Sequence, residues 1–392
     1  MESMALAHVT PSLLTWARSK AKLSLDQMAH KFVPGERIIA WEKGELVPTF
    51  PQAEAFAKKC RVPLLTLFLT EPPKEEIPLT DLRTVKDASR KKLSANFREV
   101  INDAIVRQDW YREEFPNASP RILAKRFTLD SAAVEVAEYV RKTLWINNDL
   151  LAECKDWKEY LEKLAQNAEA SGILVLRSGV VRNDTKRKLS IDEFRGFALI
   201  DDVAPLIFIN TNDTTTAQIF TLVHELVHIC IGTEGISNPD PTKAIEGVRN
   251  RTEAFCNKVA AEVLVPEQKF LRDWQSGNSI PLNLKRIVKF YKISNMVTLR
   301  RAFDLGKIPR DYFFKSVKTD YARFLKLKQK EDDSKHSGGP ELFLLFPNRN
   351  SRKFTDSVFV SLQGGKIAYT EAARMLGLTV PTLETFAKRR AA

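Results

Sequence analysis

The chain has 392 residues, 44% of them hydrophobic, and its 61 Lys and Arg outnumber its 49 Asp and Glu to give a formal net charge of +12. This hydrophobic content supports buried cores, and the length favours two to three domains. No run of about 18 apolar residues and no signal-peptide pattern is present, which argues against a membrane or secreted protein, so we expect a soluble cytoplasmic one. The positive charge favours a negatively charged partner, and nucleic acid is the simplest candidate.

Residues 1–72 carry helical patterns separated by turn signals and are predicted to form a domain of five short helices. Ser24 can cap the second helix, with Gln27 completing a capping box, and Gly44 is placed to stop the third. The helices that can be delimited span residues 11–21, 24–32, 35–43 and 51–60.

This order of short helices resembles the XRE (Cro/C1-type) helix-turn-helix. The specific part of the resemblance is the string Trp41-Glu42-Lys43-Gly44, followed by Pro48. The resemblance implies that the third helix enters the major groove of DNA, with Arg37 and Lys43 as the best contacts. The sequence departs from the usual pattern at Pro34-Gly35-Glu36, where polar base-reading residues are common and where an acid meets the field of the phosphates. The alternative is a helix-turn-helix that serves dimerisation or protein recognition.

Residues 71–80 are rich in proline and charge, which predicts a stiff, extended linker and a domain boundary near residue 72. Residues 73–150 are then predicted to form a helical connector, because apolar residues recur at helical spacing over 94–113 and 131–144. We expect these helices to pack against the domain that follows.

The most specific pattern is His224-Glu225-Leu226-Val227-His228, an HExxH sequence within a helical apolar stripe that Gly232 ends. Positions i and i+4 lie one above the other on a helix, so both imidazoles can reach one metal ion. Glu225 is then placed to act as the catalytic base that takes a proton from the water at the metal. The alternative is a chance pattern with two ordinary core or surface histidines.

A catalytic zinc needs a third protein ligand, and the predicted helix over residues 251–262 offers one. Glu253 and Asn257 are i and i+4 on one face, which suits a carboxylate ligand followed by an amide that orients a ligating histidine. Glu246 and Glu262 are the competing carboxylates. Glu253 could also be a solvated acid that favours the start of the helix.

The four cysteines, Cys60, Cys154, Cys230 and Cys256, are scattered without CxxC spacing, which is typical of buried thiols in a reducing compartment. Cys230 and Cys256 flank the predicted zinc site. Cys230 lies two residues after His228 and therefore on another face of the helix, so we do not expect it to be a ligand.

The same region predicts an α+β fold, mainly helical, with a short sheet laid on the two zinc-site helices. A helix is expected around 157–168, strands at 173–176, 194–200 and 206–209, and further helices at 284–291 and 297–305. If a strand has a free edge beside the zinc, an extended peptide could add to it. Gly196 could permit that approach, or it could be only a bulge.

Several of these segments together resemble the ImmA/IrrE family of bacterial zinc metallopeptidases. The resemblance covers roughly residues 155–315 and rests on Ile207–Asn210, Phe220–Ile229 and Glu253–Pro266. It implies a zincin-like peptidase domain, set here at 151–320, in which His224, His228 and Glu253 bind zinc and Glu225 is the catalytic base. It also implies the substrate class, because such enzymes typically cleave or inactivate helix-turn-helix repressors.

Residues 341–392 follow a segment of low hydrophobicity and are predicted to form a small C-terminal module. Its helical patterns at 369–376 and 380–389, on either side of Gly377, suggest a second helix-turn-helix, and the chain ends on positive charge. A small sheet-plus-helix element that binds a partner is the alternative, because the apolar runs at 343–346 and 358–362 could be strands.

These observations together predict a zinc-dependent metallopeptidase that acts in transcriptional regulation on a helix-turn-helix repressor. The competing hypothesis is an antitoxin and transcriptional autoregulator that neutralises a ribonuclease-like toxin without proteolysis. The expected partners are a repressor or toxin protein and DNA, with a homodimer possible and no membrane.

Overall fold

The computed structural model describes residues 5–21, 23–28, 34–60, 62–73, 94–121, 124–233, 235–237, 251–333 and 342–391. Their contacts define two compact units. The first unit contains the described residues up to 73 and residues 94–99, and the second contains those from Val100 onward. Most of the predicted connector, the peptidase segment and the C-terminal segment therefore lie together in one compact unit.

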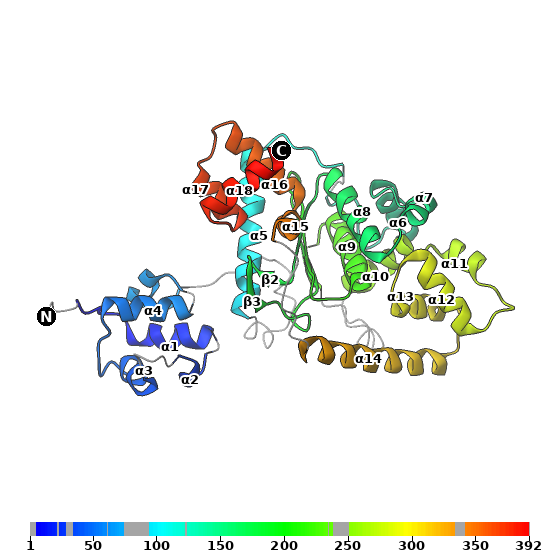
Figure 1. The fold of residues 1–392 in the computed structure, drawn as a ribbon. Coiled ribbons are helices and arrows are strands. Elements are labelled where there is room, and N and C mark those ends of the chain that lie inside the picture. The colour runs from blue at the N-terminus through cyan, green and yellow to red at the C-terminus, as the bar shows by residue number, and fades with distance from the viewer. Residues whose placement is uncertain are drawn as a thin grey trace. The chain divides into compact units, whose positions relative to one another are not determined.

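The first unit is built of short helices, as the turn signals predict (Figure 1). Trp41 and Ile38 face its core, and Gly44 adopts the left-handed conformation (φ +75°) that ends the third helix. Residues 29–33, the end of the second predicted helix, lie outside the described residues. The helices are α1 (Pro11–Lys20), α2 (Leu25–Met28), α3 (Gly35–Glu42), α4 (Phe50–Cys60) and the 3-10 helix η1 (Leu64–Phe68).

The second unit contains a mixed four-stranded sheet with the strand order β1-β5-β4-β6. β1 and β5 are parallel, whereas β4 is antiparallel to both of its neighbours, β5 and β6. A separate hairpin is formed by β2 and β3. The bounds are β1 (Leu174–Ser178), β2 (Val180–Val181), β3 (Asp184–Lys188), β4 (Gly196–Leu199), β5 (Leu206–Asn210) and β6 (Gly235–Ser237).

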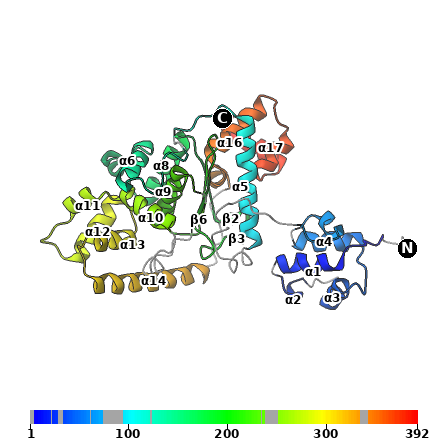
Figure 2. The same cartoon turned by 180° about the vertical axis from the view of Figure 1, so that it is seen from behind.

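Helices cover both faces of the sheet, as Figures 1 and 2 show from opposite sides. α8 and α9 lie on one face, and α5 with α15 and α16 lies on the other. The remaining helices extend the α8–α9 side or complete the C-terminal module. In chain order they are α5 (Ala95–Glu114), α6 (Ala133–Thr143), α7 (Asn148–Glu153), α8 (Trp157–Ala170), α9 (Thr215–Ile231), α10 (Arg251–Leu264), α11 (Glu267–Asp273), α12 (Ile280–Tyr291), α13 (Asn295–Asp304), α14 (Arg310–Asp333), α15 (Leu342–Arg349), α16 (Arg352–Gln363), α17 (Tyr369–Leu376) and α18 (Val380–Ala391).

Burial on both faces explains why the strands are continuous apolar runs rather than alternating ones. Ala198 and Ile207 face the core that includes α9, and the rings of Phe197 and Phe208 stack 5.1 Å apart on the opposite face. On that face the buried Gln108 of α5 donates to the carbonyl oxygens of Leu199 and Ala204. Together with α15 and α16, α5 of the predicted connector therefore covers the face of the sheet opposite α8 and α9.

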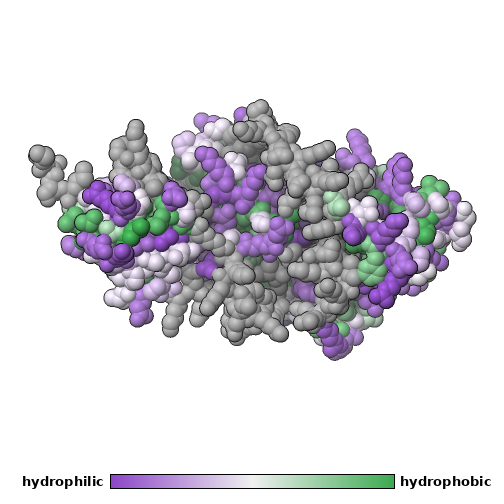
Figure 3. Space-filling view, turned by 90° about the horizontal axis from the view of Figure 1, so that it is seen from below, coloured by the Kyte–Doolittle hydropathy of each residue, from purple (hydrophilic) through white to green (hydrophobic). Residues whose placement is uncertain are grey.

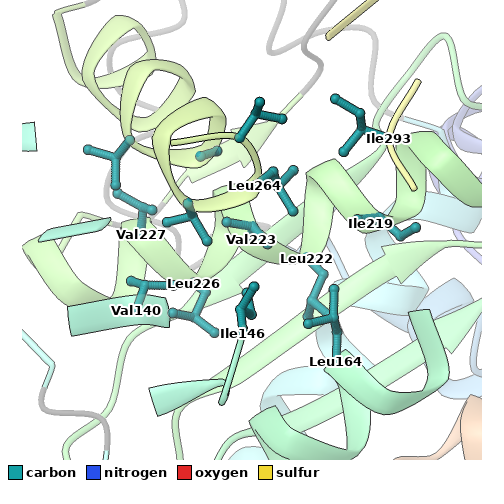
Figure 4. Close-up of a cluster of buried hydrophobic side chains, with 14 of the residues drawn as sticks. Val140, Ile146, Leu164, Ile219, Leu222, Val223, Leu226, Val227, Leu264 and Ile293 are labelled. Carbon is teal, nitrogen blue, oxygen red and sulfur yellow. The ribbon is translucent and has the colours of Figure 1, made fainter. Parts of the chain in front are cut away.

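The main core surrounds α9, and Figure 4 shows side chains from several helices converging on it. Leu222, Val223 and Leu226 of α9 meet Val140, Leu164 and Leu264 from three other helices in this cluster. Each such fully buried side chain contributes roughly 1.5–3 kcal/mol of transfer free energy. The helix that carries the HExxH sequence is therefore among the most firmly held elements of the molecule.

The predicted fold class, α+β and mainly helical, is confirmed. In the C-terminal module the apolar runs at 343–346 and 358–362 are parts of α15 and α16, so the sheet-plus-helix alternative is wrong. Among the described residues, no helix combines the length and the apolar character needed to cross a bilayer.

Candidate metal centre

α9 ends at Gly232, as its sequence indicates, and it begins after a threonine cap. Thr214 caps its N-terminus by accepting a hydrogen bond from the Ala217 N–H at 3.3 Å, and Gly232 ends it in the left-handed conformation (φ +69°). Between these caps, every side chain from Thr221 to Ile231 is buried. Polar side chains in such a helix need partners, because an uncompensated polar group in a core costs a few kcal/mol.

The imidazoles of His224 and His228 point to one place, where Glu253 of α10 meets them. The two Nε2 atoms are 3.1 Å apart. Glu253 Oε2 lies 3.3 Å from His224 Nε2, and Glu253 Oε1 lies 3.3 Å from His228 Nε2. Both histidines are fully buried, while the Glu253 side chain is 23% exposed. Sequence reasoning named these three residues, and the fold brings all three together.

Two imidazole nitrogens and a carboxylate are ligands that suit a zinc ion, and their close approach fits a shared metal. With zinc–nitrogen and zinc–oxygen bonds of about 2.0–2.1 Å, two ligand atoms at a tetrahedral site lie about 3.3–3.4 Å apart. The two Nε2 atoms lie 3.1 Å apart, and each lies 3.3 Å from a different oxygen of Glu253, so every nearest pair of donor atoms is close to this spacing. Two neutral imidazole nitrogens and a carboxylate that converge in a buried space repel one another unless a cation or a proton lies between them. Three protein ligands leave a fourth position for water or substrate.

Thr233 orients one of these histidines, and the sequence did not signal this. The Nδ1 atom of His228 lies 3.0 Å from the backbone oxygen of Thr233 and 3.1 Å from its hydroxyl oxygen. An Nδ1–H that donates to the carbonyl leaves Nε2 with a lone pair for the metal. The left-handed turn at Gly232 reverses the chain and brings Thr233 back to His228, a tertiary effect of the helix cap.

The predicted role of Asn257, to orient a ligating histidine, has no hydrogen bond to support it among the described residues. The amide was expected to orient a ligating histidine, but Asn257 Oδ1 is buried without a hydrogen-bond partner among the described residues, and so is His224 Nδ1. Thr233 occupies the orienting position at His228. The spacing of Asn257 from Glu253 places both on one face of α10, and the part played by the amide stays a prediction.

The two competing carboxylates do not join the cluster. Glu246 lies outside the described residues. Glu262 pairs with Arg301 of α13, and its Oε1 accepts from the Glu267 N–H at 3.0 Å. In the described part of the chain, His224, His228 and Glu253 are the set of three side chains that could hold a metal ion.

Glu225 is completely buried beside this cluster and packs against β4. A Cβ atom added to Gly196 would lie 3.0 Å from Glu225 Oε1, 2.5 Å from Thr221 Cγ2 and 2.9 Å from the Phe208 carbonyl oxygen. Gly196 therefore leaves the space in which the Glu225 carboxylate lies. The glycine is a close-approach position rather than a bulge, because it keeps regular pairing with Ile209 of β5.

The strand that passes Glu225 has no free edge. β4 pairs with β5 on one side and with β6 on the other, and Gly196 lies opposite Ser237. The sequence expectation that a peptide could add to a free edge beside the zinc therefore cannot apply to β4 itself while β6 is paired. β6 occupies the position that an added strand would take.

The pKa values of Glu253 and His228 indicate a site in which positive charge beside the Glu253 carboxylate is favourable. Burial by itself would raise the pKa of Glu253, but hydrogen bonds from His224 and His228 outweigh it and hold that pKa far below the ordinary 4.5. Burial would lower the pKa of His228, but its interactions with Cys256 and Glu253 outweigh it and hold that pKa well above 6.5. A bound dication would take over this role of partner to the carboxylate.

Cys256 lies against His228, one helical turn after Glu253. Burial raises the pKa of its thiol above the ordinary 9.0, so the neutral thiol prevails at pH 7. A zinc ligand must be a thiolate, and Cys256 is not among the three converging groups. Cys230 is also buried as a free thiol and is not among the converging groups.

The predicted DNA contacts are in the first unit, whereas the metal centre is in the second. Arg37 and Lys43 are both exposed, at the start and at the end of α3. Lys43 lies 3.8 Å from Glu45 in an exposed ion pair. The same unit also exposes Leu6, Phe50, Leu65 and Leu69, and Figure 3 shows hydrophobic residues at its surface. Such apolar surface commonly marks an interaction site, so the docking interpretation stays open.

Comparison with known proteins agrees with this geometry. Residues 168–303 match the family of IrrE N-terminal-like peptidase domains, and the match contains the sheet, α9 and α10. Residues 350–389 match a domain family of unknown function, DUF8813. No curated protein matches the chain. The family match supports a zincin-like metallopeptidase domain in the second unit.

Proposed function

We propose that this protein is a zinc-dependent metallopeptidase that acts on a helix-turn-helix repressor. The observation that carries the proposal is the convergence of His224, His228 and Glu253, whose nearest donor atoms lie 3.1–3.3 Å apart in a donor set suited to zinc. The fully buried Glu225 beside it supplies the carboxylate that peptide hydrolysis needs.

Each residue has a separate task in this reaction. A zinc ion held by His224, His228 and Glu253 would polarise the scissile carbonyl and acidify the attacking water. Glu225 takes the proton of that water and later returns it to the leaving amine. Thr233 holds the imidazole of His228 in the tautomer that keeps Nε2 free for the metal.

Substrate alignment in this proposal involves β6. A peptide can add its main-chain hydrogen bonds to the outer edge of β6, or it can replace β6 along β4, where Gly196 lies beside Glu225. The second arrangement brings the peptide closer to the catalytic carboxylate. Because β6 contributes only three residues, its displacement costs few hydrogen bonds.

The regulatory part of the proposal rests on the first unit. Its short helices resemble the repressor domains that such peptidases act on, and α3 presents Arg37 and Lys43 to solvent. We infer that this unit binds DNA or pairs with a repressor of the same kind, either of which would direct the peptidase to its substrate. A homodimer through this unit fits the two-fold symmetry of the operators that helix-turn-helix dimers bind.

A comparison of new protein N-termini in cells tests the proposal. Cells that express the wild-type chain should show cleaved repressor fragments that are absent with Glu225→Gln, because loss of a positioned base lowers the rate by about 100-fold or more. Glu267→Gln, the same chemical change at an exposed position of α11, is the matched control and should cleave like wild type. Glu225→Gln should still bind zinc, since the side chain is not a ligand.

One outcome would favour the antitoxin hypothesis and contradict the proposal of proteolysis. If Glu225→Gln relieves repression or neutralises a toxin as well as wild type, and no new N-terminus appears in either strain, the biological activity is binding. The metal centre would then be structural.

A further inference from the structure

We propose that the C-terminal module is a second helix-turn-helix whose last helix, α18, binds double-stranded DNA. This inference goes beyond the proposed peptidase function and does not depend on it. It rests on the geometry of α16, α17 and α18, on which side chains they expose, and on the charge of the segment.

The three helices have the connection that defines a helix-turn-helix. α17 ends at Gly377, which is left-handed (φ +65°), and α18 begins at Val380, so the turn is the three residues Gly377-Leu378-Thr379. Two helices joined by a turn of three or four residues that contains glycine are typical of this motif. The Leu378 N–H donates to the Ala373 carbonyl at 2.8 Å, and the Leu383 N–H donates to the Thr379 carbonyl at 2.9 Å.

The inner faces of these helices form a small aromatic core. Leu383 and Phe386 of α18 are buried, and the Phe386 ring contacts Phe359 of α16 (5.7 Å) and Phe346 of α15 (4.8 Å). The orientation of α18 is therefore fixed by packing. Its opposite face has a defined set of exposed side chains, which are Pro381, Glu384, Thr385, Lys388 and Arg389.

The module is attached to the peptidase body through other surfaces. Asn183, at the tip of the β2–β3 hairpin, donates to the Gly377 carbonyl at 2.8 Å. Glu169 of α8 accepts from the Ser351 hydroxyl and the Arg352 N–H, and Phe354 packs edge-on against Trp110. These contacts engage α16, its N-cap and the turn, and they leave the outer face of α18 exposed. α16–α18 and the metal-site helices lie on opposite sides of the sheet (Figures 1 and 2).

The exposed face suits a nucleic-acid duplex. Residues 350–391 carry seven Lys and Arg against three Asp and Glu, a net charge of +4, whereas residues 1–73 carry nine against seven, a net charge of +2. In a helix-turn-helix the second helix lies in the major groove and the first crosses the backbone. Lys388 and Arg389 on α18, with Arg374 and the half-exposed Tyr369 on α17, are then placed for phosphates.

Glu384 and Thr385 are the exposed polar residues in the first half of α18, where base contacts are made. A glutamate can accept from the amino group of cytosine, and a threonine can contact any base pair. Glu384 also repels phosphates, so it disfavours DNA that offers no donor at that position. This arrangement predicts sequence preference rather than charge attraction alone.

Binding of the full-length chain to a labelled duplex of about 30 base pairs, with salt raised from about 50 to 200 mM, tests the proposal. Lys388→Gln with Arg389→Gln should weaken binding about tenfold and reduce the slope of log affinity against log salt by about 2, since each lost phosphate contact removes about 0.9. Lys315→Gln with Lys318→Gln, two exposed lysines of α14, removes the same charge elsewhere and should leave the slope unchanged.

Glu384→Gln provides a test with the opposite sign. It should tighten binding to duplexes of mixed sequence by a few-fold, because a repulsive charge leaves the interface. Arg37→Ala, measured in parallel, reports the contribution of the first unit. The proposal is overturned if the Lys388–Arg389 double variant, with an unchanged thermal unfolding midpoint, keeps the affinity and salt slope of wild type. It is also overturned if that variant instead loses a co-purifying protein, because the surface would then dock a protein.

Discussion

His224, Glu225 and His228 are completely buried in the core of the second unit, whereas Arg37 and Lys43 are exposed on α3 of the first. A short sequence pattern pointed to each of these sites. At the buried site the geometry itself supports metal binding. Polar groups that converge in a core lose their hydration, and this cost must be offset by an interaction such as a bond to a metal ion. At the exposed site the geometry gives no such support, because water hydrates charged side chains at any position on a surface. The difference predicts large effects of substitution at the metal centre and small ones at α3.

The largest effect is expected on metal affinity, at Glu253. Glu253→Gln should lose most of its zinc, with an affinity drop beyond the 10–100-fold that removal of an outer partner of a ligand costs. Glu262→Gln is the matched control on the same helix. It breaks the Arg301 pair, in which the two side chains are 7% and 12% exposed, and should lower stability by about 3 kcal/mol while zinc is retained.

Elemental analysis and thermal unfolding of both variants separate these two results. Full zinc in Glu253→Gln would remove this carboxylate from the ligand set and point to Glu246.

The second largest effect is expected on the cleavage rate, from a substitution at Gly196. Gly196→Ala places a methyl group within contact distance of Glu225 and of the Phe208 backbone, so the carboxylate or the strand must shift. Overpacking of this kind costs about 1–3 kcal/mol, and misplacement of the base by a fraction of an ångström should slow cleavage roughly 10–100-fold.

Gly179→Ala is the control for Gly196→Ala, because its methyl group would meet the Asn212 side chain instead. It should lower the unfolding midpoint and leave the cleavage rate per zinc unchanged. Equal cleavage rates in the two variants would show that Gly196 does not position Glu225.

The stability of the second unit is expected to depend on pH through His228 and Glu253 of the metal centre. In zinc-free protein the raised pKa of His228 contributes stability below about pH 6.5 that is lost as the pH rises through the folded-state pKa. The lowered pKa of Glu253 contributes stability above about pH 4.5 that is lost as the pH falls. Zinc requires neutral imidazoles, so its stabilising effect should grow with pH.

Thermal unfolding with and without zinc between pH 6 and pH 8 measures this linkage. The difference between the two midpoints should widen as the pH increases. A difference that is constant over this range would mean that His228 does not exchange a proton for the metal.

The smallest effect is expected at Arg37. Arg37→Ala should weaken binding of the full-length chain to its own upstream DNA by a few-fold and lower the salt slope by about 1. Stability should change by less than about 0.5 kcal/mol, because the side chain is exposed. If DNA binding is unaffected and a partner protein is lost, α3 is a protein-docking surface.

Local sequence determined the parts of this protein in which chain neighbours are also neighbours in space. The i and i+4 spacing of His224 and His228 fixes them on one helix face whatever surrounds it, and Thr214 and Gly232 define the ends of that helix by local hydrogen bonds and backbone conformation. The apolar runs at 173–176 and 206–209 likewise indicated strands. Similar runs at 343–346 and 358–362 belong to helices, because a short apolar run does not distinguish a buried strand from a buried helix.

Only the tertiary structure decided among side chains that are distant in sequence. Glu253 and Glu262 lie on the same helix, but packing turns the first to the histidines and the second to Arg301. It also gave the orienting role at His228 to Thr233, and it paired β6 with the strand beside Glu225. Spacing along a chain limits which residues share a face, whereas the direction of that face is set by the burial of apolar surface over the whole unit.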